Sequence, residues 1–284
     1  MPRTWKTPQP VPDALLFDLL DVPPCIVQTL YNRGLTTAEG ILRFLGAGDE
    51  EPQGDPYALT GMTEAVQRLR AAIANDERIA VYGDFDVDGI CSAALLMQVL
   101  AGLGARAQVY IPHRVEEGYG LNKAAITRLA DDGIRLLITA DCGTSSIDDI
   151  AHAGSLGVDV IVTDHHHVHG PFPPAVAVVN PRRADSTYPC RDLAGVGVAY
   201  KLAQALLAQQ AEEAATYLDL VALGTVVDVA PLVGENRTLV RRGLTLMRTS
   251  PRPGLRALME QARIRPEAVD TGSLGFAIGP RLNA

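Results

Sequence analysis

The stretch that decides the fold is RIAVYGDFDVDG, residues 78–89. It begins as a short apolar run, and Asp84, Asp86 and Asp88 alternate directly after that run. A short apolar run bounded by glycine and polar residues is typical of a strand that is buried on both faces. The helical periodicity of CSAALLMQVLAGLG (91–104) follows, so the sequence predicts a strand–loop–helix unit with the three acids in its loop.

Similar apolar runs recur along the chain, and segments with helical periodicity separate most of them. These runs are AQVYI (107–111), RLLITA (135–140), VDVIVT (158–163) and AVAVVN (175–180). Buried strands that alternate with helices predict an α/β fold with a doubly wound, mainly parallel five-stranded sheet flanked by helices. We expect a helical N-terminal extension before this sheet and a mostly helical part after it.

Composition limits the class of protein. The chain has 284 residues, of which 47% are hydrophobic. No apolar run approaches the ~18 residues of a membrane span, and the N-terminus lacks the apolar core of a signal peptide. The cysteines show no CxxC spacing, so we expect a reducing cytoplasm with neither a disulfide framework nor a zinc knuckle. They are Cys25, Cys91, Cys142 and Cys190.

The formal net charge of −8 argues at first against a nucleic-acid partner. Two divalent cations held by the acidic residues would halve this charge. A bound ion can also reverse the local field that a phosphate experiences. The acidic balance therefore does not exclude a polyanionic substrate.

Acidic and imidazole side chains also follow two later strands and one helix. Asp141 follows RLLITA, His165 follows VDVIVT after Asp164, and Asp228 ends the apolar run LVALGTVV. Because parallel strands bring their carboxyl ends to one edge of a sheet, we expect these side chains to converge. Clustered carboxylates repel one another, so hard cations are their natural partners. The mixture of oxygen and imidazole ligands suits Mn²⁺ or a similar metal better than Ca²⁺. The alternatives are a solvated acidic turn, a helix cap and a surface histidine.

Several motifs, in this order and spacing, resemble the DHH phosphoesterase superfamily. They are GDFDVDG, TADCGTSS, VTDHH and LGTVVDVAPL. The further motifs IPHRVEEGYGLN, VVNPRR, LAGVGVAYKL and FAIGPRLNA make the chain similar to the RecJ-type exonucleases within that superfamily. The resemblance implies metal-dependent hydrolysis of single-stranded DNA from its 5′ end, with release of 5′ mononucleotides, in DNA repair and recombination.

The resemblance also implies a role for each residue of the site. Two Mn²⁺ ions would bind, with Mg²⁺ as a substitute. The ligands of the first ion would be Asp88, Asp141, His165 and Asp228. The second ion would be held by Asp86 and the shared Asp141, with Asp84 nearby. His166 would contact the scissile phosphate or act as an acid toward the leaving oxygen, whereas His167 and His169 would be incidental.

For the substrate, the resemblance suggests Arg114, Arg281 and Asn283 as residues that grip phosphates. Gly195 and Gly197 would let a helix N-terminus approach the nucleic acid. A solvated loop charge explains Arg114 equally well, and close helix packing explains the glycines nearly as well. A path along the DNA backbone would use further arginines, each of which could also be a plain surface charge. These are Arg182, Arg183, Arg237, Arg241 and Arg242.

By resemblance, we expect an N-terminal helical extension over residues 1–60, a DHH phosphoesterase catalytic domain over 61–250 and a helical linker over 251–284. RecJ-like proteins continue past the PRLNA motif into a second α/β domain, so the chain is expected to be a fragment. The implied partners of this monomer are single-stranded DNA with a 5′ end, a single-strand-binding protein and a RecQ-type helicase, with no membrane. A small-substrate phosphoesterase for oligoribonucleotides or cyclic dinucleotides, a non-catalytic scaffold and an inactive fragment stay open as alternatives.

Overall fold

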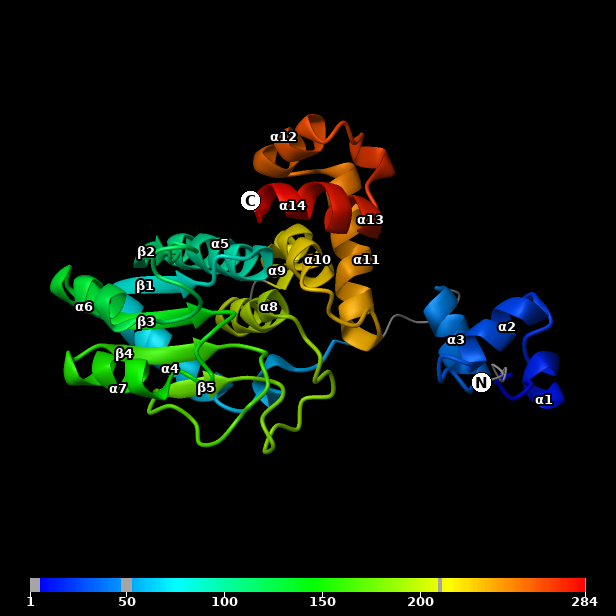
Figure 1. Ribbon diagram of the computed structural model, residues 1–284, viewed down its shortest axis with the longest axis horizontal. Helices are drawn as coiled ribbons and strands as arrows, with labels where there is room; N and C mark the ends of the chain where they lie inside the picture. The colour runs from blue at the N-terminus through cyan, green and yellow to red at the C-terminus, as the bar shows by residue number, and fades with distance from the viewer. Residues whose placement is uncertain (1–5, 47–52, 209–210, 284) are drawn as a thin grey trace, which may run out of the picture. The chain divides into compact units, whose positions relative to one another are not determined.

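The computed structural model describes residues 6–46, 53–208 and 211–283. The chain divides into two compact units, residues 1–52 and 53–284 (Figure 1). Each unit has its own hydrophobic core and is described by itself.

The first unit consists of three short helices. They are α1 (Asp13–Phe17), α2 (Pro24–Tyr31) and α3 (Ala38–Leu45). The side chain of Thr37 caps α3 by accepting a hydrogen bond from the Gly40 N–H, and Gly46 ends the helix in the left-handed conformation. The predicted helical N-terminal extension is therefore confirmed.

The second unit contains a five-stranded sheet in which all strand pairs are parallel. Its strands are β1 (Arg78–Gly83), β2 (Arg106–Tyr110), β3 (Ile134–Ala140), β4 (Asp159–Thr163) and β5 (Ala177–Val179). Their order in the sheet is β2-β1-β3-β4-β5. The predicted sheet is confirmed. From β1 the chain first adds β2 on one side and then β3, β4 and β5 on the other, so the direction of winding reverses between β1 and β3. In such folds ligands bind at the carboxyl ends of the strands beside this reversal.

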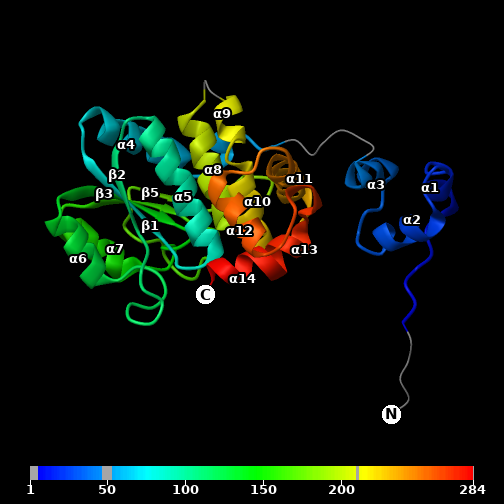
Figure 2. The ribbon, with the colours of Figure 1, turned by 90° about the horizontal axis from the view of Figure 1, so that it is seen from above.

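Helices cover both faces of the sheet (Figure 2). One face packs against α4 (Met62–Ala74), α5 (Val87–Gly102) and α8 (Gly195–Leu206). The other face packs against α6 (Lys123–Asp131) and α7 (Ile147–Ser155). Side chains alternate along β1, with Ile79 and Val81 in the first core and Ala80 and Tyr82 in the second. Burial on both faces explains why β1, β3, β4 and β5 are largely apolar, whereas the edge strand β2 is only partly buried and carries Arg106 and Gln108.

The rest of the second unit is mostly helical, as predicted. Its elements are the short turn η1 (Pro56–Ala58), α9 (Ala211–Ala215), α10 (Leu218–Val227), α11 (Gly234–Thr249), α12 (Pro253–Gln261), η2 (Pro266–Ala268), α13 (Thr271–Ser273), the π-helical turn η3 (Leu274–Ile278) and α14 (Gly279–Leu282). Helix α10 is apolar all round because it packs between α5, α8 and α11.

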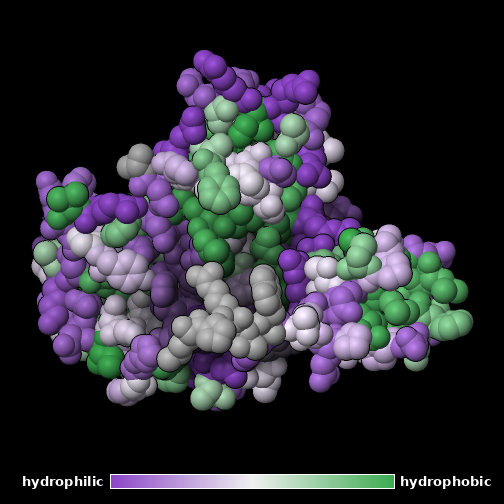
Figure 3. All heavy atoms as spheres, turned by 45° about the vertical axis from the view of Figure 1, so that its right-hand side comes forward, coloured by the Kyte–Doolittle hydropathy of each residue, from purple (hydrophilic) through white to green (hydrophobic). Residues whose placement is uncertain are grey.

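The surface of the second unit is not uniform. On the face that Figure 3 shows, hydrophobic side chains gather below the C-terminal helices, where these meet the rest of the unit. Within the described part of the chain, no helix combines the length and the apolar character that crossing a bilayer requires.

Candidate metal centre

Three carboxylates lie where the loop after β1 leads into α5. Asp84 is in the loop, whereas Asp88, which the sequence placed in the loop, lies in the first turn of the helix. Asp86 is the N-cap of α5, and its Oδ1 accepts a hydrogen bond of 2.9 Å from the Gly89 N–H. Asp84 and Asp88 are buried. A Cβ at position 89 would stand 2.5 Å from the carbonyl oxygen of Asp84, so only glycine lets α5 begin this close to the strand.

Asp141 occupies the equivalent position after β3. Its N–H donates to the carbonyl oxygen of Thr163 at 3.0 Å, which extends the sheet by one residue. Its φ of 67° lies in the left-handed region, which is uncommon for a residue other than glycine. Such backbone strain is often found at functional sites. The carboxylate of Asp141 is buried at the reversal of the strand order.

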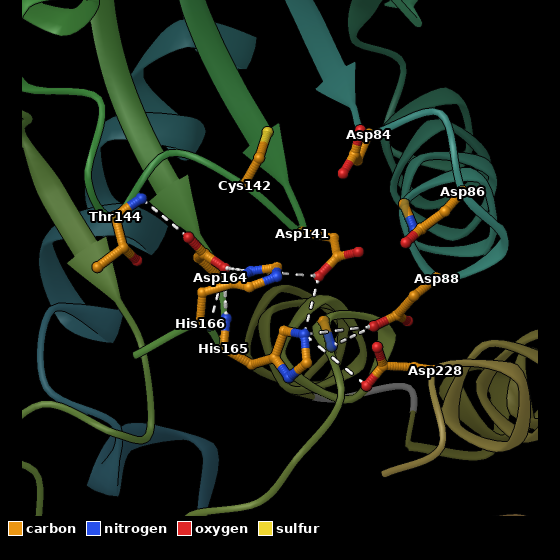
Figure 4. A network of polar contacts seen from close by, with 12 residues as sticks. Asp84, Asp86, Asp88, Asp141, Cys142, Thr144, Asp164, His165, His166 and Asp228 are labelled. Carbon is orange, nitrogen blue, oxygen red and sulfur yellow. Dashed lines mark hydrogen bonds and ion pairs between the residues drawn. The ribbon is translucent and has the colours of Figure 1, made fainter. Parts of the chain in front are cut away.

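His165 and Asp228 complete the cluster from two further elements (Figure 4). His165 follows β4, and Asp228 is the C-cap of α10. The Nε2 atom of His165 lies 3.1 Å from Asp141 Oδ1, 3.8 Å from Asp88 Oδ2 and 3.9 Å from Asp228 Oδ2. The predicted convergence of these residues is therefore present in the structure.

Among the described residues, three overlapping groups could hold a metal ion. They are Asp84 with Asp86 and Asp141, Asp88 with His165 and Asp228, and Asp141 with His165 and His166. In each group the ligand atoms lie within 4.8 Å of one another. Asp141 and His165 each belong to two of the groups, and of the two only the carboxylate has two oxygens with which it could bridge two cations.

Unsatisfied polar atoms show that the cluster fits cations. Asp84 Oδ2, Asp141 Oδ1 and His165 Nε2 are buried and form no hydrogen bond within the described structure. The 3.1 Å contact between His165 Nε2 and Asp141 Oδ1 lacks the geometry of a hydrogen bond. Buried polar atoms in proteins are nearly always paired, because an unpaired one loses its hydration without compensation. A cation is the partner that can satisfy two carboxylates and an imidazole together.

The electrostatics of the cluster point the same way. Burial raises the pKa of Asp84 to about 6. Burial also raises the pKa values of Asp88, Asp141 and Asp228 above their ordinary range, and neighbouring carboxylates in the cluster add to the rise in each. Removing these charges from water is unfavourable unless positive charge compensates them. Cations bound here would displace protons and keep the carboxylates ionised.

Helix α8 holds Asp88 in place. The N–H groups of Gly195 and Val196 donate to the two oxygens of Asp88 at 2.7 and 2.9 Å. A helix N-terminus is a favourable position for a carboxylate, because its N–H groups are free and its dipole is positive. A Cβ at position 195 would stand 2.4 Å from Asp141 Oδ1. The absence of a side chain at Gly195 therefore lets the start of α8 contact both Asp88 and Asp141.

His166 is oriented by Asp164, a residue for which the sequence suggested no role. Asp164 Oδ1 accepts hydrogen bonds from His166 Nδ1 at 2.7 Å and from the His166 N–H at 3.0 Å. Burial alone would raise the pKa of Asp164, but the bonds from His166 lower it to about 2. The same hydrogen bond raises the pKa of His166. The Tyr119 hydroxyl lies 3.1 Å from His166 Nε2 on the other side of the ring.

A profile of the DHH family, N-terminal domain, matches residues 78–225, which contain every residue of the cluster except Asp228. The chain belongs to the DHH family. It is 39% identical over 282 residues to the single-stranded-DNA-specific exonuclease RecJ of Bacillus subtilis (strain 168), a match that covers 99% of this chain and 35% of that protein.

Solved structures agree with this relationship. RecJ from Thermus thermophilus in complex with Mn²⁺ has a TM-score of 0.78 and 32% identity, over 95% of this DHH chain and 38% of that one. The complex of the same protein with Mg²⁺ has a TM-score of 0.67 and 31% identity, over 96% of this chain and 35% of that one. This DHH chain spans about a third to a half of the length of the curated relatives it matches.

Of the three predicted phosphate-binding residues of this DHH chain, Arg114 and Asn283 contact each other, whereas Arg281 bonds the backbone near its own helix. Arg114 is exposed, stacks over the ring of Phe85 at 4.3 Å and donates to Asn283 Oδ1 at 3.4 Å. Arg281 is exposed and donates to the carbonyl oxygen of Ala277. Arg114 and Asn283 are thus neighbours although 169 residues separate them in sequence.

The two glycines are buried in the first turn of α8. The N–H of Gly195 is engaged by Asp88, and a Cβ at Gly197 would meet Leu193 at 3.2 Å. Close packing accounts for both residues, and their contact with nucleic acid stays a prediction.

Two arginines of the expected backbone path have acidic neighbours. Arg182 lies 3.3 Å from Asp192, and Arg183 forms an ion pair with Asp185 and stacks on Phe172. A role for these arginines along DNA also stays a prediction.

Proposed function

We propose that this chain is a metal-dependent phosphodiesterase that removes 5′ mononucleotides from single-stranded DNA in the 5′-to-3′ direction. The observation that carries the proposal is the buried Asp141 Oδ1, which has no hydrogen-bond partner and belongs to two groups of metal-ligand geometry. The identity to RecJ over nearly the whole chain supports the choice of single-stranded DNA as substrate.

The residues present fit two cations. Asp88, Asp141, His165 and Asp228 would hold one Mn²⁺, and Asp86 with the shared Asp141 would hold the other beside Asp84. Mg²⁺ is the second candidate. Bound cations of this kind lower the pKa of a water molecule toward neutrality and offset negative charge on a phosphoryl group.

His166 supplies proton chemistry beside the cations. Its Nδ1 is fixed by Asp164, so a substrate would meet its Nε2, which the Tyr119 hydroxyl contacts at 3.1 Å in this structure. The hydrogen bond to Asp164 raises the pKa of His166, and when the ring is protonated its Nε2–H can donate to a phosphate oxygen or to the leaving oxygen. Burial raises the pKa of Tyr119, so its hydroxyl stays neutral and can share this role.

Arg114, Arg281 and Asn283 are proposed to hold the substrate phosphates. The stacking on Phe85 orients the guanidinium of Arg114 while its N–H groups remain able to bind a phosphate. The contact between Arg114 and Asn283 brings two of the three candidates to one place near the acidic loop. Gly195 and Gly197 would contribute through the helix that they begin.

A hydrolysis assay tests the proposal. The chain is incubated with Mn²⁺ and a 5′-phosphorylated single-stranded DNA, and in parallel with a blunt duplex, a short RNA and a cyclic dinucleotide. We expect mononucleotides from single-stranded DNA alone, and no product with excess chelator. The matched control Asp141→Asn keeps the size of the side chain but removes the bridging charge, and should be inactive. Preferential cleavage of the cyclic dinucleotide or the RNA would replace this proposal by the small-substrate alternative.

A further inference from the structure

Asn180, in the NPRR stretch after β5, connects three loops at the carboxyl edge of the sheet. It is fully buried. Its Nδ2 donates to Thr144 Oγ1 and to the carbonyl oxygen of His166, both at 2.9 Å, and its Oδ1 accepts from the Arg182 N–H at 2.8 Å. The side chain therefore ties the loops after β3 and β4 to the turn after β5.

The chemistry of these partners fixes the orientation of the amide. A backbone carbonyl can only accept, so Nδ2 must face His166, and a backbone N–H can only donate, so Oδ1 must face Arg182. An aspartate at this position would direct an oxygen at the carbonyl of His166. Among side chains of this size, only an amide supplies both donors and the acceptor.

Thr144 continues the connection toward the metal centre. Its hydroxyl accepts from Asn180, and its N–H donates to Asp164 Oδ2 at 2.8 Å. Asp164 Oδ1 in turn binds His166 through Nδ1 and the backbone N–H. Asn180, Thr144, Asp164 and His166 thus form a closed ring of hydrogen bonds, since Asn180 also binds the carbonyl of His166.

This ring of hydrogen bonds restrains His166, whose side chain is too exposed to be held by packing alone. The side chain of His166 is 47% exposed. The ring instead holds its carbonyl, its N–H and its Nδ1 from one buried assembly. Groups that act on a substrate must be held within roughly 0.5 Å of their productive position, and supporting hydrogen bonds provide that precision.

We propose that Asn180, acting through Thr144, is a positioning residue that fixes the imidazole of His166 at the metal centre. This inference rests on the proposed function, in which His166 meets the substrate. The competing explanation is that Asn180 only stabilises its own turn, where the Arg182 N–H meets its side chain and the Arg183 N–H meets its carbonyl.

Substitutions at Thr144 separate these explanations, because they leave that turn intact. Thr144→Val keeps the shape and the N–H to Asp164 but removes the hydroxyl that accepts from Asn180. Thr144→Ser keeps the hydroxyl. Thr127→Val is the matched control, since the Thr127 hydroxyl bonds Lys123 and His152 in α6 and α7, away from the metal centre.

Two readouts are compared on the full chain. With Mn²⁺ and 5′-phosphorylated single-stranded DNA, Thr144→Val should lower kcat by about 10- to 100-fold, the usual effect of losing a supporting hydrogen bond at a metal site. KM, Mn²⁺ affinity and the unfolding midpoint should stay close to those of the unsubstituted chain. Thr144→Ser should restore most of kcat, and Thr127→Val should not lower it.

The second readout needs no activity. In the ¹⁵N-histidine spectrum of the metal-free chain, the ring signals of His166, identified by their loss in His166→Gln, should shift or broaden in Thr144→Val and Asn180→Ala. They should stay in place in Thr144→Ser and Thr127→Val. Unchanged ring signals in Thr144→Val and Asn180→Ala would overturn the positioning role, as would a kcat that Thr144→Val leaves intact. A chain that cleaves no single-stranded DNA but shows these shifts would refute the proposed function and retain the positioning of His166.

Discussion

Gly195 packs against the carboxylate of Asp141 so tightly that a Cβ at position 195 would stand 2.4 Å from Asp141 Oδ1. Its N–H meanwhile donates to Asp88 Oδ2 at 2.7 Å. One glycine thus contacts two carboxylates, one from the first turn of α5 and one from the end of β3. No side chain can occupy this space unless Asp141 moves.

The substitution Gly195→Ala should therefore damage metal binding more than folding. We expect Mn²⁺ affinity to fall by about 10- to 100-fold, as for other changes that disturb ligand orientation. Helical content, measured by circular dichroism, should be retained because alanine is a good helix former. Calorimetric titration measures the affinity, and an affinity for Mn²⁺ equal to that of the unsubstituted chain would show that the contact has no such role.

Gly154→Ala is the matched control. Gly154 lies in α7, and a Cβ there would meet nothing within 4 Å. This change should leave Mn²⁺ affinity unaltered and raise the free energy of unfolding by up to ~1 kcal/mol, because glycine is the poorer helix former.

The raised pKa of Asp84 predicts how the stability of the metal-free chain depends on pH. Burial raises this pKa to about 6, whereas an unfolded aspartate titrates near ~3.9. The folded state therefore binds more protons between these values, so stability falls as pH rises through this window and levels off above it. We expect Asp84 to contribute on the order of 1–2 kcal/mol to this loss.

Denaturant unfolding at pH 5 and pH 7 without metal measures this dependence. The side-chain amide that Asp84→Asn introduces cannot titrate. The free energy of unfolding of this variant should therefore differ less between pH 5 and pH 7 than that of the unsubstituted chain. Saturating Mn²⁺ should stabilise the unsubstituted chain at pH 7, because the ion binds only the folded state. The assignment fails if Asp84→Asn and the unsubstituted chain depend on pH equally.

A buried ion pair lies in the second unit away from the metal centre. Lys201 of α8 and Glu235 of α11 pair with almost no exposure. Tyr188 donates to Glu235 at 2.6 Å, and Lys201 donates to the carbonyl oxygen of Gly54 at 3.1 Å. Burial lowers the pKa of Lys201, and Glu235 opposes that effect. Lys201→Met should cost about 3–5 kcal/mol, because it leaves a buried carboxylate without its partner.

The double variant Lys201→Met with Glu235→Gln removes the charge as well and should recover part of that loss. Urea unfolding of both variants measures the difference. Equal free energies of unfolding for the single and double variants would mean that the unpaired charge of Glu235 does not cause the loss of stability in Lys201→Met.

The strands, and the convergence of the candidate metal ligands, could be predicted from the sequence for one shared reason. A strand buried on both faces must be apolar along its length, so polar residues such as Asp141 and His165 stand out where it ends. Asp228 is a weaker signal, because an acid at the end of an apolar helix is unremarkable alone and its unfavourable place on the helix dipole only mildly indicates a metal partner. The order of the motifs then connected these positions to one family.

The hydrogen bonds around the site could not be predicted in this way. Asp164 and Thr144 come from different loops, and the contact between Arg114 and Asn283 joins parts of the chain that are far apart in sequence. Periodicity specifies which face of an element is buried, but not which side chains from separate elements will meet. The sequence likewise left two explanations for Gly195, and only the distance to Asp141 shows what its missing side chain permits.

The central claim is that Asp141 bridges two cations, and a crystal structure of the chain grown with Mn²⁺ tests it most directly. Anomalous scattering at the manganese edge locates the ions. We predict two ions about 4 Å apart, with oxygens of Asp141 on both, Asp88, His165 and Asp228 on one, and Asp86 on the other. A single ion, or a pair of ions that Asp141 does not touch, would contradict this account.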